Sequence, residues 1–185
     1  MMKFIKSIIE DIDSVFGRDP AARNRIEILF LYPHIKALIA YKISHSLYLK
    51  KRFFLARWVS NIGRRMTGIE IHPGATIGKG LFIDHGMGVV IGETAIIGNN
   101  VKMFHGATLG GTGNEKGKRH PTVGDNVIIG SSAKILGNIY IASGTKVGAN
   151  AVVLHDTSPN STVVGIPAKE VKKGSKIIYL NEYAI

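Results

Sequence analysis

A six-residue period runs from residue 71 to residue 153 and constrains the fold of the chain more than any other feature. An apolar residue recurs at thirteen positions in register, and glycine follows it in seven of these units. These positions are Ile71, Ile77, Ile83, Ile91, Ile97, Met103, Leu109, Val123, Ile129, Ile135, Ile141, Val147 and Val153. Each unit suits one short strand and one turn, and three units make a coil with three flat faces. The period therefore predicts a β-helix from residue 71 to about residue 158.

The first 68 residues follow a helical period instead. Apolar residues within 4–16 fall on one stripe of a 3.6-residue period, which predicts an amphipathic helix. Asp19-Pro20 has the form of an N-cap followed by proline at the first helical position, so a second helix is expected there. Pro33 predicts the start of a third helix, and residues 53–66 a fourth. We expect this region to cap one open end of the β-helix.

Composition narrows the classes of function. The chain has 24 Lys and Arg against 13 Asp and Glu, a formal charge of +11, which indicates an anionic partner or a solvated basic surface. With no cysteine, disulfides, thiolate zinc ligands and a cysteine nucleophile are excluded. We find no signal-peptide core, no apolar run long enough for a membrane span and no helix-turn-helix pattern. We expect a cytoplasmic protein with no membrane or nucleic-acid partner.

The period is interrupted twice, and both interruptions contain histidine. Residues 83–91 span eight positions instead of six, and residues 109–123 span fourteen. The first interruption contains Asp84-His85, and an imidazole beside a carboxylate can take a proton from a hydroxyl and return it to a leaving group. The second is a Gly-rich loop with a basic end, in which Arg119 suits bidentate pairing with a carboxylate. Function is expected at these interruptions, although a basic solvated loop is the alternative for the second.

A zinc site is the alternative from another enzyme class. His105 follows His85 by twenty residues, one eighteen-residue coil plus the two-residue slip, so the rings are expected to stack about 5 Å apart. With His72 or His120 as a third ligand, such a pair would bind zinc without cysteine. The enzyme would then resemble the γ-class carbonic anhydrases, a zinc lyase. We expect no metal, and metal analysis of the purified protein separates the two hypotheses.

Five segments together resemble the serine acetyltransferases. They are residues 70–78 (EIHPGATIG), 83–94 (IDHGMGVVIGET), 108–113 (TLGGTG), 119–121 (RHP) and 133–138 (AKILGN). The repeat alone indicates only the acyltransferase superfamily, whereas DHG together with GGTG and RHP is specific to this branch. The resemblance implies a left-handed parallel β-helix of hexapeptide repeats with an N-terminal α-helical region. We predict a helical domain at 1–68, a catalytic β-helix at 69–168 and a C-terminal tail at 169–185.

The resemblance also implies a reaction, in which acetyl-CoA is the co-substrate and its acetyl group passes to the L-serine hydroxyl. The product, O-acetyl-L-serine, is used in cysteine biosynthesis. His85 is then the general base, Glu70 the carboxylate that orients it, and His120 a residue at the reaction centre. Backbone N–H groups of Gly110-Gly111 are candidates to stabilise the oxyanion. Serine binding is implied for Asp19, Asp84, Arg119 and His120. Acetyl-CoA binding is implied for Gly111, Thr112, Ser131, Lys146, Ala149 and Lys169.

The resemblance extends to partners. It implies a homotrimer, or a dimer of trimers, and binding of O-acetylserine sulfhydrylase through the C-terminal Ile185. The closest rival function is a sugar or antibiotic O-acetyltransferase on the same scaffold, which would keep acetyl-CoA and lose the serine contacts. A chain that acts mainly as a binding partner of the sulfhydrylase is a further alternative.

Overall fold

The computed structural model describes residues 2–114 and 116–171. Four helices come first: α1 (Met2–Phe16), α2 (Arg25–Leu31), α3 (Pro33–Leu49) and α4 (Phe53–Thr67). Short strands follow: β1 (Glu70–Ile71), β2 (Thr76–Ile77), β3 (Phe82–Asp84), β4 (Val90–Ile91), β5 (Ile96–Ile97), β6 (Lys102–Phe104), β7 (Thr108–Gly110), β8 (Thr122–Val123), β9 (Ile128–Ile129), β10 (Lys134–Leu136), β11 (Tyr140–Ile141), β12 (Lys146–Val147), β13 (Val152–Val153), β14 (Thr162–Val164) and β15 (Lys169–Glu170). Across the described residues, no helix has the length and apolar character needed to span a membrane.

Three of the four predicted helices are confirmed. The helix α1 covers the predicted apolar stripe, and α3 begins at Pro33. The helix α4 ends at Thr67, because Gly68 adopts the left-handed conformation (φ 70°) that closes a helix C-terminus.

The predicted helix start at Asp19-Pro20 is wrong. The helix α2 begins later, at Arg25, where the Asn24 side chain caps it. The Asp19 carboxylate instead accepts the Ala21 N–H at 2.8 Å and the Tyr32 hydroxyl at 2.7 Å. An aspartate bonded to the amide two residues on forms a turn, so the same cap chemistry here bends the chain.

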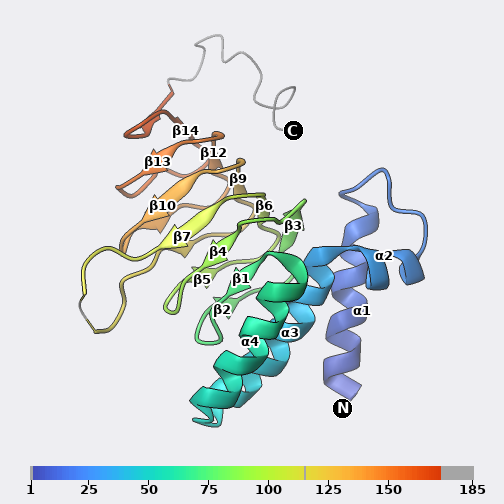
Figure 1. The fold of residues 1–185 in the computed structure, drawn as a ribbon. Coiled ribbons are helices and arrows are strands. Elements are labelled where there is room, and N and C mark those ends of the chain that lie inside the picture. Colours follow the sequence, from blue (N-terminus) through green and yellow to red (C-terminus); the bar gives the residue numbers. More distant parts are fainter. Residues whose placement is uncertain (1, 115, 172–185) are drawn as a thin grey trace.

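The strands form three sheets that wrap into a parallel β-helix (Figure 1). Sheet A has the order β1-β4-β7-β10-β13, sheet B β11-β8-β5-β2, and sheet C β15-β14-β12-β9-β6-β3. Neighbouring strands are parallel except β14 and β15, which pair antiparallel at the far end. Each complete coil gives one strand to each sheet, as the six-residue period predicts.

The core is a stack of the predicted repeat positions. Twelve of the thirteen are buried and Ile77 is partly buried, so the register of the prediction is confirmed throughout. Burying such a branched side chain contributes roughly 1.5–3 kcal/mol. At the first coil, Leu38 and Tyr41 of α3 join this core beside Ile69 and Ile71. The helices therefore close one end of the β-helix, the lower end in Figure 1.

Two corners of the coil position the candidate site. The C–A corner contains the turns that lead from sheet C to sheet A, and the A–B corner those that lead from sheet A to sheet B. The first interruption lies in the C–A corner, between β3 and β4. The second lies in the A–B corner, between β7 and β8, where it projects as a long loop (yellow, at the left of Figure 1). The two interruptions thus flank sheet A.

Candidate active site

The C–A corner presents His85 to solvent. His85 has φ +59°, in the left-handed region, and its side chain is 68% exposed. Its Nε2 atom lies 3.8 Å from Oδ1 of Asp84. His105 stands one coil further along the same corner, with ring centroids 6.1 Å apart in an edge-to-face arrangement. The prediction from the twenty-residue spacing that His85 and His105 lie side by side is confirmed, with the rings edge to face rather than stacked.

Asp84 faces a charged and aromatic neighbourhood on sheet C. Lys102 places its Nζ atom 3.4 Å from Oδ2 of Asp84. The same ammonium lies 4.6 Å from the Phe104 ring centroid and 5.4 Å from that of Phe82. Such cation–π contacts hold the lysine in place. Asp84, next to the candidate base, thus lies beside a platform formed by Phe82, Lys102 and Phe104.

The helices bring Asp19 to this platform. Hydrogen bonds from the Tyr32 hydroxyl and the Ala21 amide lower the pKa of Asp19, and nearby Lys102 adds to this effect. Burial and the bond to Asp19 raise the pKa of Tyr32 to about 12. Asp19 is therefore ionised at neutral pH. The ammonium group of Lys102 attracts the carboxylate of Asp19 as well as that of Asp84.

His34 is a buried imidazole within the same platform. It is 2% exposed, and its ring packs edge-on against Phe82 at 5.0 Å and Tyr32 at 5.9 Å between centroids. Burial lowers its pKa to about 4, although the carboxylates of Asp84 and Asp19 favour the charged form. The ring is therefore neutral at neutral pH.

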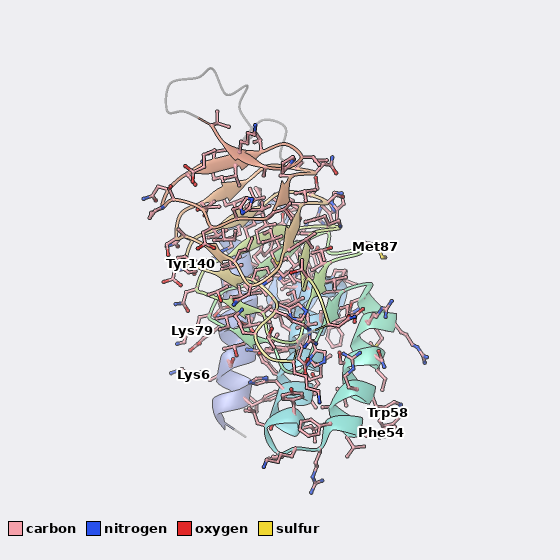
Figure 2. The ribbon with its side chains drawn as sticks, turned by 90° about the vertical axis from the view of Figure 1, so that its left-hand side faces the viewer. Lys6, Phe54, Trp58, Lys79, Met87 and Tyr140 are labelled. Atoms are coloured by element: carbon pink, nitrogen blue, oxygen red, sulfur yellow. The ribbon has the colours of Figure 1, made fainter. Side chains whose placement is uncertain are left out.

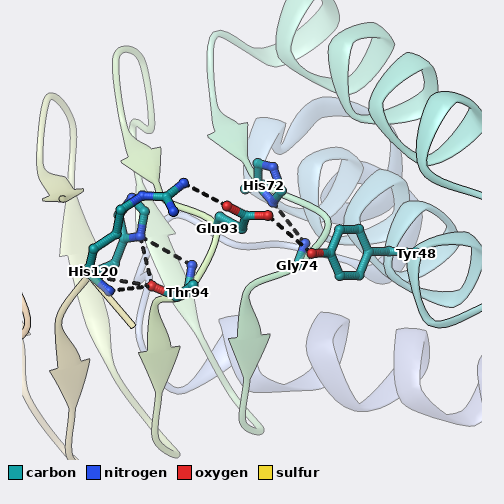
Figure 3. A network of polar contacts seen from close by, with 7 residues as sticks. Tyr48, His72, Gly74, Glu93, Thr94 and His120 are labelled. Atoms are coloured by element: carbon teal, nitrogen blue, oxygen red, sulfur yellow. Dashed lines mark hydrogen bonds and ion pairs between the residues drawn. The ribbon is translucent and has the colours of Figure 1, made fainter. Parts of the chain in front are cut away.

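The A–B corner holds Arg119 and His120 in a network of polar contacts (Figure 3). The Thr94 hydroxyl accepts the amides of Arg119 and His120 at 3.0 and 3.1 Å, and lies 2.9 Å from Nδ1 of His120. The Arg119 guanidinium donates to Glu93 at 2.6 Å, and Glu93 also accepts the Tyr48 hydroxyl at 3.1 Å. The base of the long loop is thereby tied to the coil below and to α3.

Burial and neighbouring charges set protonation states in this corner. Burial, with Arg119 nearby, lowers the pKa of His120, which is 8% exposed. Burial also lowers the pKa of His72 to about 4, and its Nδ1 accepts the Gly74 amide. Burial alone would raise the pKa of Glu93, but the bonds from Arg119 and Tyr48 bring it below its ordinary value. The corner thus combines an ionised carboxylate with neutral imidazoles.

Gly92 makes room for the His120 ring. A Cβ atom added at this glycine would lie 1.9 Å from Cδ2 and 2.1 Å from Nε2 of His120. These distances are far shorter than any contact between non-bonded atoms. The His120 ring can therefore occupy this place only because residue 92 has no side chain.

Glu70 is engaged by a partner other than His85. Its carboxylate lies 3.1 Å from Nη1 of Arg64, near the end of α4. Within residues 2–114 and 116–171, no hydrogen bond or ion pair joins Glu70 to His85. The two residues lie on either side of the C–A corner, Glu70 on β1 of sheet A and His85 directly after β3 of sheet C.

The residues predicted to bind acetyl-CoA lie in three places: the C–A corner, sheet C and the A–B corner. Ser131 and Ala149 lie in the C–A corner on successive coils, with the amide of the next residue, Asn150, donating to the Ser131 carbonyl. Lys146 and Lys169 are exposed on sheet C, on β12 and β15. Gly111 and Thr112 are in the A–B corner, where Gly111 lies against Arg119 and Thr112 against Gly137.

Within one chain, the predicted site residues remain in two places. His85 and Asp84 are at the C–A corner, with Asp19 held by the helices near Lys102 of sheet C, and Arg119 and His120 are at the A–B corner. From Gly88 to Gly92 the chain crosses sheet A in four residues, which is about 13 Å of strand.

A zinc ligand set is likewise incomplete in one chain. The described part of the chain contains no group of three side chains placed to hold a metal ion. His72 and His120 are at the A–B corner, so neither joins the pair of His85 and His105 at the C–A corner.

Sequence reasoning missed three residues of the A–B corner: Tyr48, Glu93 and Thr94. A signal for Thr94 exists, since His120 follows it by twenty-six residues, one eighteen-residue coil plus the eight residues added by the loop. The two are thus in register. Tyr48 comes from α3, and the repeat contains no information about that helix.

Comparison with known proteins agrees with this architecture. A family model described as bacterial transferase hexapeptide (six repeats) matches residues 120–155. The serine acetyltransferase of Bacillus licheniformis is 58% identical over 175 residues, covering 95% of this chain and 81% of the relative. That of Helicobacter pylori is 56% identical over 162 residues, covering 88% of this chain and 95% of the relative.

Solved structures of serine acetyltransferases are also similar to this chain. The serine acetyltransferase of Neisseria gonorrhoeae in complex with serine has a TM-score of 0.87 at 44% identity, over 92% of this chain and 70% of that one. The soybean apoenzyme has a TM-score of 0.86 at 44% identity, over 91% and 69%. The fold is the left-handed parallel β-helix with N-terminal helices implied by the resemblance. With such identity over most of both chains, this chain belongs to the serine acetyltransferase family.

Proposed function

We propose that this chain transfers the acetyl group of acetyl-CoA to the L-serine hydroxyl, giving O-acetyl-L-serine, with His85 as the general base. The observation that carries the proposal is the exposed pair of Asp84 and His85 at a break in an otherwise regular coil. Related solved serine acetyltransferases were captured with serine and with CoA, which supports both substrates.

The chemistry follows from the exposure of His85. Its imidazole takes the proton of the serine hydroxyl as the serine oxygen attacks the thioester carbonyl. The new C–O bond forms, the C–S bond then breaks, and the protonated imidazole gives its proton to the departing thiolate of CoA. We propose that Glu70 orients this imidazole, although Glu70 pairs with Arg64 in the free chain.

Charged groups from both corners suit a zwitterionic amino acid. The carboxylates of Asp19 and Asp84 would receive the serine ammonium group. Arg119 would pair with the serine carboxylate, because its bond to Glu93 uses only part of its five-donor guanidinium. A sugar offers neither charge, which favours serine over the rival substrate class.

His120 is suited to donate a hydrogen bond at the reaction centre. The backbone N–H of Thr94 donates to Nδ1 of His120 at 3.2 Å, so this nitrogen acts as an acceptor. In a neutral ring the proton is then on Nε2. We propose that this N–H, with the amides of Gly110-Gly111, stabilises the oxyanion that develops on the thioester carbonyl.

The site is proposed to be shared between copies of the chain. A serine molecule cannot bridge the roughly 13 Å of strand that separates the two corners. A ring of three copies, each with sheet A toward a common axis, would bring the C–A corner of one copy beside the A–B corner of the next. This supports a homotrimer, alone or as a dimer of trimers. Residues 69–168 would form the catalytic unit, with 1–68 as the helical domain and 169–185 as the tail.

The C–A corner also suits acetyl-CoA. The column that starts at His85 continues past His105 to Ser131 and Ala149, which would line the path of the pantetheine arm. Lys146 and Lys169 would meet the phosphates, and Gly111 and Thr112 would contact the cofactor from the A–B corner of the neighbouring copy. The predicted sulfhydrylase contact at Ile185 lies outside the described residues. This contact and the cytoplasmic location both stay predictions.

Thiol release from acetyl-CoA tests the function. We expect release with L-serine and little with a panel of sugars and aminoglycosides, with mass spectrometry identifying O-acetyl-L-serine. Release that depends on a sugar and not on serine would establish the rival function, and no acetyl transfer at all would refute the enzyme assignment.

A further inference from the structure

Lys102 is a charged side chain that the reaction steps proposed above do not use. On sheet C its strand β6 pairs with β3, so that Lys102 stands opposite Phe82 and Phe104 opposite Asp84. The side chain of Lys102 is only 29% exposed, and the two phenylalanines beside its ammonium are 2% and 5% exposed. A surface lysine normally keeps its ammonium in water. Here the ammonium is instead held against two buried aromatic rings.

The Lys102 ammonium contacts one of the two oxygens of Asp84. Its Nζ atom is 3.4 Å from Oδ2, whereas Oδ1 is 3.8 Å from Nε2 of His85. The carboxylate group of an aspartate turns readily about its last torsion, because that torsion has broad minima. A cation fixed at Oδ2 therefore also fixes where Oδ1 points. The structure thus divides the carboxylate between a resident cation and the side on which the candidate base lies.

Lys102 also balances the charge of two neighbouring carboxylates. It favours the charged form of Asp19 as well as contacting Asp84. Both carboxylates act on the buried ring of His34, which is neutral at neutral pH and compensates neither. Arg18 acts on His34 too, but its guanidinium donates to the Gly80 carbonyl and to Asn100. Two like charges oppose each other's ionisation, so a cation beside both of them makes the pair less costly.

We propose that Lys102 is a positioning residue for serine, which holds Asp84 by Oδ2 and leaves Oδ1 and the Asp19 carboxylate to receive the substrate ammonium group. The proposal rests on the proposed function and adds a residue that acts through Asp84 without touching serine or the reacting atoms. Loss of the Lys102 charge would then weaken serine binding. The turnover of bound substrate and the binding of acetyl-CoA would change little.

Steady-state kinetics of the purified full-length chain test the proposal. Lys102→Met keeps an unbranched side chain without the charge, and we expect it to raise the KM for serine about 5-fold, as for loss of a partly exposed ion pair. The kcat and the KM for acetyl-CoA should stay within about 2-fold. Lys102→Arg keeps a cation that packs on aromatic rings and should restore the serine KM to within about 2-fold. Circular dichroism would verify that each variant is folded.

Lys79→Met is the matched control. Lys79 is also paired with a carboxylate, that of Glu10 at 3.7 Å, but its side chain is 84% exposed. Figure 2 shows Lys79 on one side of the molecule and Met87, in the C–A corner, on the other. This variant loses the same charge far from the proposed serine contacts, so its serine KM should equal that of the wild type.

Chemical rescue separates the charge of Lys102 from its packing. In Lys102→Ala the space between Phe82, Phe104 and Asp84 is vacated, and propylammonium has the three carbons and the ammonium that are missing. At low serine concentration and constant ionic strength, we expect propylammonium to raise serine-dependent thiol release by this variant several-fold. The uncharged isostere 1-propanol should not, and neither compound should activate the wild type. Equal rescue by the two compounds would assign Lys102 a packing role and overturn the proposal.

The remaining outcomes keep this proposal and the proposed function apart. A serine KM that is unchanged in Lys102→Met overturns the positioning role, and a lower KM overturns it by showing that the ammonium competes with serine. Calorimetry measures serine binding by the same proteins. If the wild type binds serine about 5-fold more tightly than Lys102→Met but transfers no acetyl group, the reaction is refuted and the role of Lys102 supported. A wild type that does not bind serine refutes both.

Discussion

Acidification is expected to destabilise the fold through His34. In the unfolded chain an imidazole titrates near pH 6.5, whereas burial between Tyr32 and Phe82 brings the folded pKa of His34 to about 4. Between these values the unfolded state binds more protons than the folded state. Stability from this group is therefore fully present above pH 6.5 and is lost as the pH falls toward 4.

The magnitude follows from the two pKa values. An unfolded pKa near 6.5 and a folded pKa of about 4 correspond to about 3 kcal/mol at the acidic limit. Between pH 7 and pH 4.5, the same linkage predicts a loss of about 2 kcal/mol from His34 alone. This is a large part of the roughly 5–15 kcal/mol that stabilises a typical domain.

The matched experiment compares urea unfolding of the wild type and His34→Phe at pH 7 and pH 4.5, at equal protein concentration. Phenylalanine keeps an aromatic ring and removes the titration, so the loss of stability of this variant should be smaller by about 2 kcal/mol. Other groups, including His72, act in both proteins and cancel. His155→Gln, a change at an exposed histidine, should behave as the wild type does. An equal pH dependence in wild type and His34→Phe would refute the burial argument.

Three further substitutions test the site. Gly92→Ala should displace the His120 ring and lower kcat strongly while the melting temperature falls only slightly; unchanged kcat would contradict the clash. His85→Asn, which tolerates the left-handed backbone, should lower kcat by about 10²–10⁴ with CoA binding retained. Thr94→Val should raise KM for serine, because both Arg119 and His120 lose a bond to the hydroxyl. A serine KM equal to that of the wild type would show that Thr94 does not position them.

The β-helix was predictable because its determinant is local and repeated. Every coil needs an inward apolar residue at the same step, so the register can be counted along the sequence without knowing any contact. The interruptions were readable for the same reason, since extra residues in a fixed coil must leave it at a corner. The same counting assigns Asp84-His85 and Arg119-His120 to corners of the coil.

The features that could not be predicted from the sequence depend on contacts between elements. The helix predicted at Asp19-Pro20 does not form there, because Asp19 accepts both the Ala21 amide in a local turn and the hydroxyl of Tyr32, just before α3. Tyr48, which donates to Glu93, the carboxylate bound by Arg119, could not be predicted because it comes from α3 and the repeat contains no information about that helix. Spacing along the chain indicates which residues share a corner, but not what packs against that corner.

Subunit complementation tests the shared site most directly. His85→Asn and His120→Ala each remove one half of the site, so each variant alone should be inactive. In co-expressed mixed trimers, an interface that joins an intact His85 to an intact His120 arises in about one case in four. We therefore predict that serine-dependent thiol release recovers to about a quarter of the wild-type value. Mixed trimers as inactive as either variant alone would contradict the shared site and require both histidines from one chain.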